Sequence, residues 1–526
     1  MVAVIATSGA SCGDGETPPN CDRPGDCGGG DWEPPQVPIV DAGSESGADS
    51  GAGPVAVTDA GAEAEADAAV AADSGAGADA GAGPDAGAEA DAGADADAGP
   101  LIRDQWIGGP CESAASCNYP GAICLASGFQ GGHCSLACTR TCPDRASQPV
   151  TFCIDGDDAT GRCVSKCATD ADCRAGYRCG ARGRFNEPTT LQNVCVPPDV
   201  RPAPLPASPS PYPARIAAVR ATHDTTKLEQ ILVADGVSVP ANSKVAVVRI
   251  TQSAGAFSYQ YFDFKGTLFS DAFWPASTIK LFAALAALET LEDRGHSVRS
   301  NIHYAGGYDG PFRTVMNDAL IVSDNTSYDR LMLLAGFDEI NTAFLAPERG
   351  FERTVLQRSY GAYNAIRNSP AITLDEGTKQ TSIPARQGTG TYACANSGNC
   401  TNPFELGDAI RRVALHERLS DGERFRIFRD DLAYLRVALS TNKGQSIFSA
   451  AEAVFGAGNT VIYKKSGLAG GWRLDNAFLR DKATGEEYVV TIALPDTTPI
   501  PRFFDITKSS LSAIRAGRLT TTPVVP

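Results

Sequence analysis

A serine and a lysine three positions apart could form a catalytic pair in this 526-residue chain, in the stretch Ser277-Thr-Ile-Lys280. The Ala- and Leu-rich run that follows has high helix propensity, and Pro275 stiffens the approach to it. On a helix, a spacing of three puts both side chains on one face. A lysine whose pKa is lowered by burial can take the proton of a serine hydroxyl and make it a nucleophile. The spacing is therefore consistent with a catalytic serine–lysine pair.

Two further motifs follow in chain order, Ser323-Asp324-Asn325 and Lys465-Ser466-Gly467. Each has a structural alternative, because the first would also cap a helix beginning near Thr326 and the second could be a strand followed by a turn. We expect Asp324 to have the structural role. Ser440-Thr-Asn-Lys443 repeats the serine–lysine spacing, but a Gly follows at once and no helix is expected to begin there. The order of the three motifs favours a catalytic site built around Ser277.

The elements that must position these motifs begin near Pro213. Hydrophobic patterns predict helices at 227–233, 277–294, 326–335, 339–344, 404–419, 431–439 and 507–516. They predict strands at 243–250, 256–264, 460–463, 474–480 and 487–493. The predicted strands lie near the start and near the end of this part of the chain, with helices between them. This order implies an α+β domain in which the early and late strands form one sheet.

From about Pro213 to the end, the chain resembles the class A β-lactamase and penicillin-recognising serine hydrolase family, whose signature is S-x-x-K, S-D-N and K-T-G in this order. The resemblance implies an antiparallel sheet packed with helices, an all-helical lobe and a substrate cleft between them. It implies that Ser277 is the acylated nucleophile and Lys280 its proton acceptor. Ser323 would pass the proton to the leaving nitrogen.

The resemblance also implies the residues that hold the substrate. Asn325 would position its amide, and Lys465 with Ser466 would hold its carboxylate. The N–H groups of Ser277 and of Leu468, which follows Gly467, would form the oxyanion hole. A cationic Lys465 is expected to lower the pKa of the neighbouring Lys280. No cofactor and no metal are expected.

One departure from the family pattern affects the second half of the reaction. The class A pattern Arg-x-Glu-x-x-x-Asn in the Ω-loop appears here as Arg358-Ser-Tyr360-Gly-Ala-Tyr-Asn364, and Thr381-Ser-Ile-Pro384 resembles the next landmark of the family. Tyrosine, with a pKa near 10, is a poor general base at neutral pH. We therefore expect competent acylation and slow hydrolysis of the acyl-enzyme, unless the base is supplied by Glu348, Glu352, Asp375 or Glu376. Ser397-Gly-Asn399 fits a looser S-x-N motif, but we interpret it as a turn.

The first hundred residues differ from the rest in composition. Residues 41–100 carry 14 Asp and Glu and no Lys or Arg, which accounts for most of the net charge of −17. The Ala-, Gly- and Asp-rich segment 28–100 cannot bury a core and is expected to be a disordered tether. Residues 1–27 are interpreted as a truncated signal or lipoprotein segment with Cys12 as the lipid-modified residue, or as an ordinary disordered terminus. No basic patch indicates nucleic-acid binding, and no apolar run has the length of a membrane span.

Residues 101–196 form a cysteine-rich region, with 12 of the 17 cysteines. Cys134-x3-Cys138 recurs 29 residues later as Cys163-x3-Cys167, which predicts three units of four cysteines with two disulfides each. Zinc sites are not expected, because C-x2-C pairs are absent. Cys394 is expected to pair with Cys400. The Pro-rich stretch 197–212 reads as a stiff spacer before the domain at 213–526.

Three functions remain open from the sequence. The first is a β-lactamase-type serine hydrolase acting on β-lactams. The second is a D-Ala-D-Ala carboxypeptidase or related cell-wall peptidase, a penicillin-binding protein with the same acyl-serine. The third is a non-catalytic envelope protein that binds through its cysteine-rich region. In each case we expect an exported monomer at the cell envelope or outside it, because cysteine parity suits an oxidising compartment.

Overall fold

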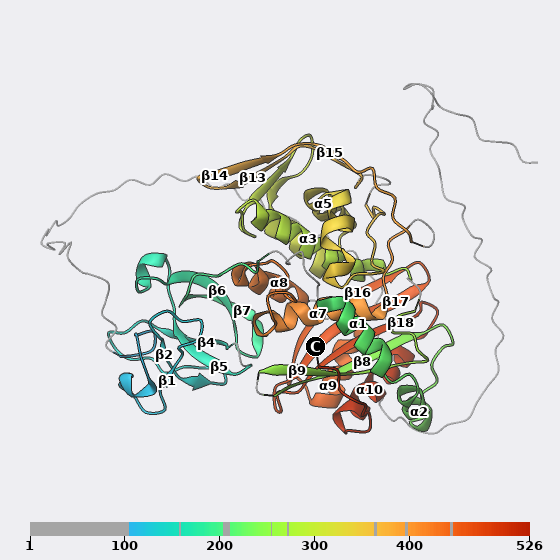
Figure 1. Ribbon diagram of the computed structural model, residues 1–526, viewed down its shortest axis with the longest axis horizontal. Coiled ribbons are helices and arrows are strands. Elements are labelled where there is room, and N and C mark those ends of the chain that lie inside the picture. The colour runs from blue at the N-terminus through green and yellow to red at the C-terminus, as the bar shows by residue number, and fades with distance from the viewer. Residues whose placement is uncertain are drawn as a thin grey trace, which may run out of the picture. The chain divides into compact units, whose positions relative to one another are not determined.

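The computed structural model of the chain (Figure 1) describes residues 105–156, 159–203, 211–253, 255–270, 273–361, 366–394, 398–441 and 445–525. The expected signal segment with Cys12 and the acidic tether lie outside these residues. Among the helices of the described ranges, none is both long and apolar enough to cross a membrane.

The cysteine-rich module, residues 105–196, is held together by six disulfides. In each of its three units the first cysteine pairs with the third and the second with the fourth: Cys111–Cys124, Cys117–Cys134, Cys138–Cys153, Cys142–Cys163, Cys167–Cys179 and Cys173–Cys195. The sequence predicted the units but left this connectivity open. Disulfides stabilise such a module because its apolar clusters are small, the largest in the described residues being Phe152, Ile154, Val164, Val194 and Val196.

Two antiparallel sheets form the framework of the module. The larger has the strand order β3-β5-β4-β6-β7, and the smaller pairs β1 with β2. The strands are β1 (Ile123–Cys124), β2 (Cys134–Ser135), β3 (Ala137–Cys138), β4 (Thr151–Asp155), β5 (Gly161–Ser165), β6 (Arg178–Arg184) and β7 (Glu187–Val196). Two short 3-10 turns, η1 (Ala114–Ser116) and η2 (Asp170–Asp172), complete it.

The C-terminal domain, residues 211–525, is built on a five-stranded antiparallel sheet with the order β16-β17-β18-β8-β9. Its strands are β8 (Lys244–Ser253), β9 (Ala256–Asp263), β16 (Thr460–Ala469), β17 (Trp472–Asp481) and β18 (Glu487–Pro495). As predicted, the first and last strands of the domain share one sheet. Strand β16 lies at its edge, so one side of its backbone is left for other partners.

Alternating side chains of the sheet enter two separate cores. Val245 and Val247 on β8 pack with helices α2 (Lys227–Ala234), α9 (Gln445–Phe455) and α10 (Ile500–Arg515), and α9 and α10 lie beside each other in Figure 1. Ala246, Val248 and Ile250 enter the other core, with α1 (Pro211–Thr222) and α7 (Pro403–Leu415). Both faces are therefore buried, which explains the nearly continuous apolar run of β8.

A helical lobe covers the second face. Its helices are α3 (Lys280–Asp293), α4 (Phe312–Asn317), α5 (Asn325–Ala335), α6 (Phe337–Glu339) and α8 (Arg429–Thr441), with shorter turns η4 (Asp318–Val322), η5 (Ile340–Phe344), η6 (Pro347–Arg349) and η8 (His416–Arg418). Helix α3 is apolar on all sides and lies inside the lobe, where its Ala and Leu side chains are fully buried.

The lobe also carries strands that the sequence did not predict. β10 (Asn301–Tyr304), β11 (Asp309–Pro311), β13 (Ile372–Glu376) and β14 (Lys379–Ile383) form a sheet of order β11-β10-β13-β14, and β12 (Asn368–Ser369) pairs with β15 (Arg386–Gln387). Helices α1, α4 and α9 were not predicted either. Helix α1 begins inside the Pro-rich stretch. Pro is common both in extended spacers and at the first position of a helix, so the prolines did not reveal where this helix begins.

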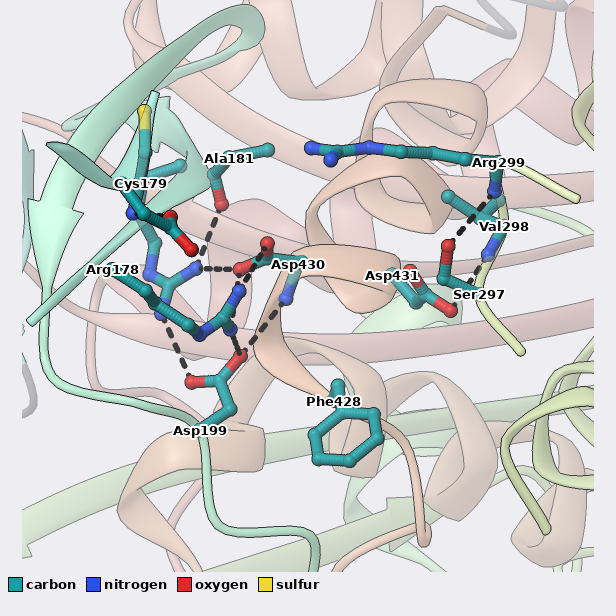
Figure 2. Close-up of polar contacts among 12 residues, drawn as sticks. Arg178, Cys179, Ala181, Asp199, Ser297, Val298, Arg299, Phe428, Asp430 and Asp431 are labelled. Carbon is teal, nitrogen blue, oxygen red and sulfur yellow. Dashed lines mark hydrogen bonds and ion pairs between the residues drawn. The ribbon is translucent and has the colours of Figure 1, made fainter. Parts of the chain in front are cut away.

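The cysteine-rich module contacts the C-terminal domain through helix α8 (Figure 2). Arg178 and Arg182 on β6 donate to the carboxylate of Asp430 in the first turn of α8, at 2.5–3.0 Å, and also to Asp199. We call these four residues the ion-pair clamp. A Cβ at Gly180 would lie 2.8 Å from Asp430 Oδ1, so a larger residue there would force the Asp430 carboxylate to shift. The start of the Pro-rich stretch, expected to be a spacer, thus takes part in the contact.

Candidate active site

Ser277 lies in a short 3-10 turn, η3 (Ala276–Ile279), that runs directly into helix α3. The serine is half-buried, and its neighbours in the turn are buried. The preceding residue, Ala276, has a φ of 46°, in the left-handed region. A residue other than glycine adopts this conformation at a cost of roughly 1–2 kcal/mol. The contacts around the turn therefore have to hold it in this shape.

Lys280, the first residue of α3, is fully buried beside the second motif. Its Nζ donates hydrogen bonds to the carbonyl of Ser323 and to Oδ1 of Asn325 at 2.8 Å, and it lies 3.4 Å from Ser323 Oγ. Burial lowers the pKa of Lys280 to about 8, although the negative charges of Asp324 and Asp329 oppose the shift. A lysine with this pKa is neutral often enough near pH 7 to act as a general base.

The second motif bends the chain so that its serine and asparagine both face Lys280. Ser323 has a φ of 70° and ends the π-helical turn η4. Asp324 is the N-cap of α5, and its carboxylate accepts a hydrogen bond from the N–H of Ser327 at 2.6 Å. The predicted structural role of Asp324 is confirmed.

Lys465 approaches the same serine from the edge strand β16, where it is 1% exposed. Its Nζ donates to Ser323 Oγ at 2.9 Å and to the carbonyl of Ser466 at 3.0 Å. The Ser323 hydroxyl therefore lies between two lysines. Burial, with the positive charges of Lys280 and Lys464, lowers the pKa of Lys465 to about 7. The sequence predicted that Lys465 would lower the pKa of Lys280, but at Lys280 the main cause is burial.

At Gly467, strand β16 lies directly against the turn η3 (Ala276–Ile279). This turn carries the expected nucleophile Ser277, and we call it the nucleophile turn. A Cβ at this position would lie 2.8 Å from the backbone nitrogen of Ser277 and 3.0 Å from that of Thr278. Only glycine allows this approach. The next residue, Leu468, is 54% exposed, and Ser466 is half-buried. All eight predicted site residues thus belong to three segments that meet around Ser277, Ser323 and Gly467.

Residues 266–503 match the model of the beta-lactamase enzyme family. The match covers most of the C-terminal domain, which is therefore similar to this family. Among solved structures, a class A β-lactamase of the last common ancestor of Gram-negative bacteria is 17% identical and covers 55% of this chain and 98% of its own, with a TM-score of 0.38. The β-lactamase from Sphaerobacter thermophilus is 14% identical and covers 56% of this chain and 98% of its own, also with a TM-score of 0.38. No curated protein matches the chain.

In this β-lactamase-like domain, Tyr360 lies against the nucleophile turn. Its hydroxyl donates a hydrogen bond to the carbonyl of Ala276 at 2.9 Å. Its own N–H and that of Gly361 donate to Asp329 on α5, each at 2.9 Å. Burial raises the pKa of the Tyr360 phenol above its usual value. A phenol that stays protonated and donates to a carbonyl does not act as a general base. Asn364, the last residue of the Ω-loop pattern, lies outside the described residues.

The carboxylates considered as substitute bases make contacts elsewhere. Glu352 forms an ion pair with Arg220 at 2.8 Å. Glu376 accepts hydrogen bonds from Ser297 and Ser300 next to the small sheet. Asp375 lies beside it on β13, and Glu348 in the turn η6 lines a separate cavity of about 550 Å³ behind α3. The geometry of the described residues gives none of the four a place beside Ser277.

The looser S-x-N candidate is structural, as predicted. Asn399 is 1% exposed, and its Oδ1 accepts the N–H groups of Gln357 and Arg358 at 2.8 and 2.9 Å. It thereby fixes the loop that carries Tyr360. The predicted disulfide Cys394–Cys400 closes this loop segment, while Ser397 lies outside the described residues. Ser440, in the repeated serine–lysine spacing, is buried in α8 and donates to the carbonyl of Ile462 at 2.9 Å.

Two residues that shape the site carried no motif in the sequence. Asp329 is 5% exposed and holds the loop of Tyr360 through three hydrogen bonds. Trp274 packs against Tyr360 with ring centres 5.8 Å apart, and the guanidinium of Arg358 lies 5.0 Å from the centre of the Trp274 ring. The available signals were an Asp five residues after the helix cap Asp324 and a Trp three residues before Ser277.

Proposed function

We propose that the C-terminal domain is a serine hydrolase that forms an acyl-enzyme with β-lactams at Ser277 and hydrolyses it slowly. The observation that carries the proposal is the Ser323 hydroxyl, placed 2.9 Å from Lys465 Nζ and 3.4 Å from Lys280 Nζ beside the nucleophile turn. This arrangement provides a base, a proton relay and a cation within one buried cluster.

The acylation step can be assigned to these groups atom by atom. Neutral Lys280 takes the proton of Ser277 Oγ, and the oxygen bonds to the lactam carbonyl carbon. The negative charge on the carbonyl oxygen is met by the N–H groups of Ser277 and Leu468. The carbon–nitrogen bond then breaks as Ser323 gives its proton to the nitrogen, and the Lys280 ammonium restores the proton of Ser323. Lys465 would hold the substrate carboxylate, with Ser466, and Asn325 its side-chain amide.

Hydrolysis of the ester needs a base for water, and the position assigned to it by the family pattern holds Tyr360. The raised pKa of this phenol and its hydrogen bond to Ala276 make it unsuited to that task. The acyl-enzyme is therefore expected to persist.

A D-Ala-D-Ala carboxypeptidase is the second candidate, because it uses the same acyl-serine and needs no such glutamate. The absence of a carboxylate at position 360 favours it. A non-catalytic envelope protein is the third and is disfavoured by the intact cluster of Ser277, Lys280, Ser323 and Lys465. All three would suit an exported, monomeric protein held at the envelope by its N-terminal segment.

Intact-mass spectrometry of the full chain after addition of benzylpenicillin tests the proposal, with Ser277→Ala as the control. We expect an adduct on the parent protein that persists, and none on the variant. A short-lived adduct with accumulating penicilloate would show an efficient β-lactamase and overturn slow hydrolysis. No adduct would overturn acylation by β-lactams.

Restoring a carboxylate at position 360 should shorten the life of the adduct. Tyr360→Glu is expected to speed deacylation by about 10- to 100-fold, less than the ~10²–10⁴ of a fully adapted base, because the loop has not been shaped around a water. The deacylation rate, read from the decay of the adduct mass after removal of free penicillin, checks this. An unchanged decay would show that position 360 does not face the ester.

A further inference from the structure

Tyr360 makes a hydrogen bond that bears on acylation as well as on hydrolysis. Its hydroxyl donates to the carbonyl of Ala276, and this carbonyl belongs to the same peptide group as the N–H of Ser277. A peptide group is planar, with its C=O and N–H pointing in opposite directions. A hydrogen bond that fixes the carbonyl therefore also fixes the direction of the Ser277 N–H.

The other side of this peptide group faces strand β16. A Cβ at Gly467 would lie 2.8 Å from the Ser277 nitrogen, so this nitrogen lies against the strand that carries the other expected oxyanion donor, Leu468. The backbone of Ala276, which leads into this peptide group, is strained, because its φ is 46°. A strained group needs a partner to hold its orientation, and Tyr360 is placed to be that partner.

Tyr360 is itself held rigidly between two motifs. Its ring packs between Tyr328 on α5, with centres 4.8 Å apart, and Trp274, three residues before the nucleophile. Its N–H donates to Asp329, also on α5. The ammonium of Lys280 lies 5.9 Å from its ring centre. The side chain thus ties the Ser323-Asp-Asn helix to the nucleophile turn.

We propose that Tyr360 is a positioning residue for acylation: through the carbonyl of Ala276, its hydroxyl orients and polarises the Ala276–Ser277 peptide so that the Ser277 N–H points into the oxyanion hole. Hydrogen bonds in series strengthen one another, so a donor at the carbonyl makes the N–H a better donor to the developing oxyanion. The inference rests on the proposed function for its substrate, but it concerns the first half of the reaction rather than the second.

Tyr360→Phe tests this, because it removes the hydroxyl and keeps the stacked ring. We expect the acylation rate constant at saturating benzylpenicillin to fall about 3- to 10-fold, the size of one lost neutral hydrogen bond, with little change in the concentration for half-maximal rate. The lifetime of the adduct should stay unchanged. An unchanged acylation rate would overturn the proposal, and so would a changed lifetime without a slower acylation, which would place the hydroxyl in hydrolysis.

Tyr328→Phe is the matched control. It removes a hydroxyl from the same aromatic stack, one that donates to the carbonyl of Arg358 and not to the nucleophile turn. It is expected to lower the melting temperature at least as much as Tyr360→Phe while acylation stays within about twofold of the parent. Equal slowing in both variants would show that general loosening of the loop is responsible and would overturn the positioning role.

A fluorophosphonate separates this inference from the proposed function. It bonds phosphorus to Ser277 Oγ with loss of fluoride, the serine proton passing to Lys280, and its phosphoryl oxygen uses the same oxyanion hole. If benzylpenicillin gives no adduct but the fluorophosphonate labels Ser277 more slowly in Tyr360→Phe, the substrate class is wrong and the positioning role stands. Equal labelling rates, or no labelling of Ser277, would overturn the positioning role as well.

Discussion

Two lysines share the hydroxyl of Ser323. In the proposed mechanism, their lowered pKa values would set the pH range in which acylation can proceed. Lys280, with a pKa of about 8, accepts a proton only when neutral, so the rate should fall as pH decreases below that value. Lys465, with a pKa of about 7, holds a carboxylate only when charged, so substrate capture should weaken as pH rises. The second-order acylation rate is therefore expected to be bell-shaped, with its maximum between about pH 7 and 8.

Stopped-flow acylation from pH 5.5 to 9.5, with the melting temperature followed in parallel, measures this profile. Lys465→Arg is the informative variant, because a guanidinium stays charged throughout the range. It should lose the alkaline limb and keep the acid limb, which belongs to Lys280. An alkaline limb that survives in this variant would assign it to another group.

At the scale of elements, the site depends on how closely the edge strand β16 lies to the nucleophile turn. Gly467→Ala would place a methyl group 2.8 Å from the Ser277 nitrogen, and backbone atoms cannot move aside as a flexible side chain can. The strand should be displaced, which separates Lys465 from Ser323 and opens the oxyanion hole. We expect acylation to fall at least about 100-fold, the cost of losing one oxyanion donor.

Gly471→Ala, in the turn between β16 and β17, is the control for this variant. A Cβ there meets nothing within 4 Å, although its φ of 82° makes the substitution strained. It should lower the melting temperature by a few degrees and leave the acylation rate close to that of the parent. Comparable loss of acylation in both variants would mean that strand stability, and not the approach at Gly467, controls the site.

The strands of the central sheet and most of the helices could be predicted from the sequence. Apolar runs such as that of Lys244–Ser253 are long and regular enough to indicate the type of element by themselves. Short pieces could not. The strand Asn301–Tyr304 is defined by its partners Asp309–Pro311 and Ile372–Glu376 rather than by its own pattern. The three motifs located the site, but Asp329 and Trp274 emerged only from tertiary packing, since neither has a distinctive spacing.

At the scale of the whole molecule, the cysteine-rich module and the C-terminal domain meet through ion pairs between residues far apart in the chain. Arg178 and Arg182 share the carboxylate of Asp430, and Asp199 joins both arginines. A second pair, Arg480 with Asp155 at 3.0 Å, links β17 to β4. No local pattern could predict these contacts. Helix α8, which carries Asp430, also packs against β16, where Ser440 donates to Ile462.

Asp430→Ala should loosen this contact by leaving two largely buried guanidinium groups with one carboxylate. Side chains of the clamp are 5–28% exposed, so we expect a loss of about 2–3 kcal/mol, below the roughly 3–5 kcal/mol seen when a fully buried pair is broken. Hydrogen exchange of β6, β7 and the first turn of α8 in the full chain measures this loss of stability.

Asp421→Ala is the control. It removes a 68% exposed acid paired with Arg424 at 3.2 Å, which should cost less than about 1 kcal/mol. Because Asp430 and its arginine partners make no contact with Ser277, Lys280, Ser323 or Lys465 among the interactions of the described residues, acylation should change little in either variant. If exchange at β6 and β7 is no faster in Asp430→Ala than in Asp421→Ala, the clamp does not hold the two parts together.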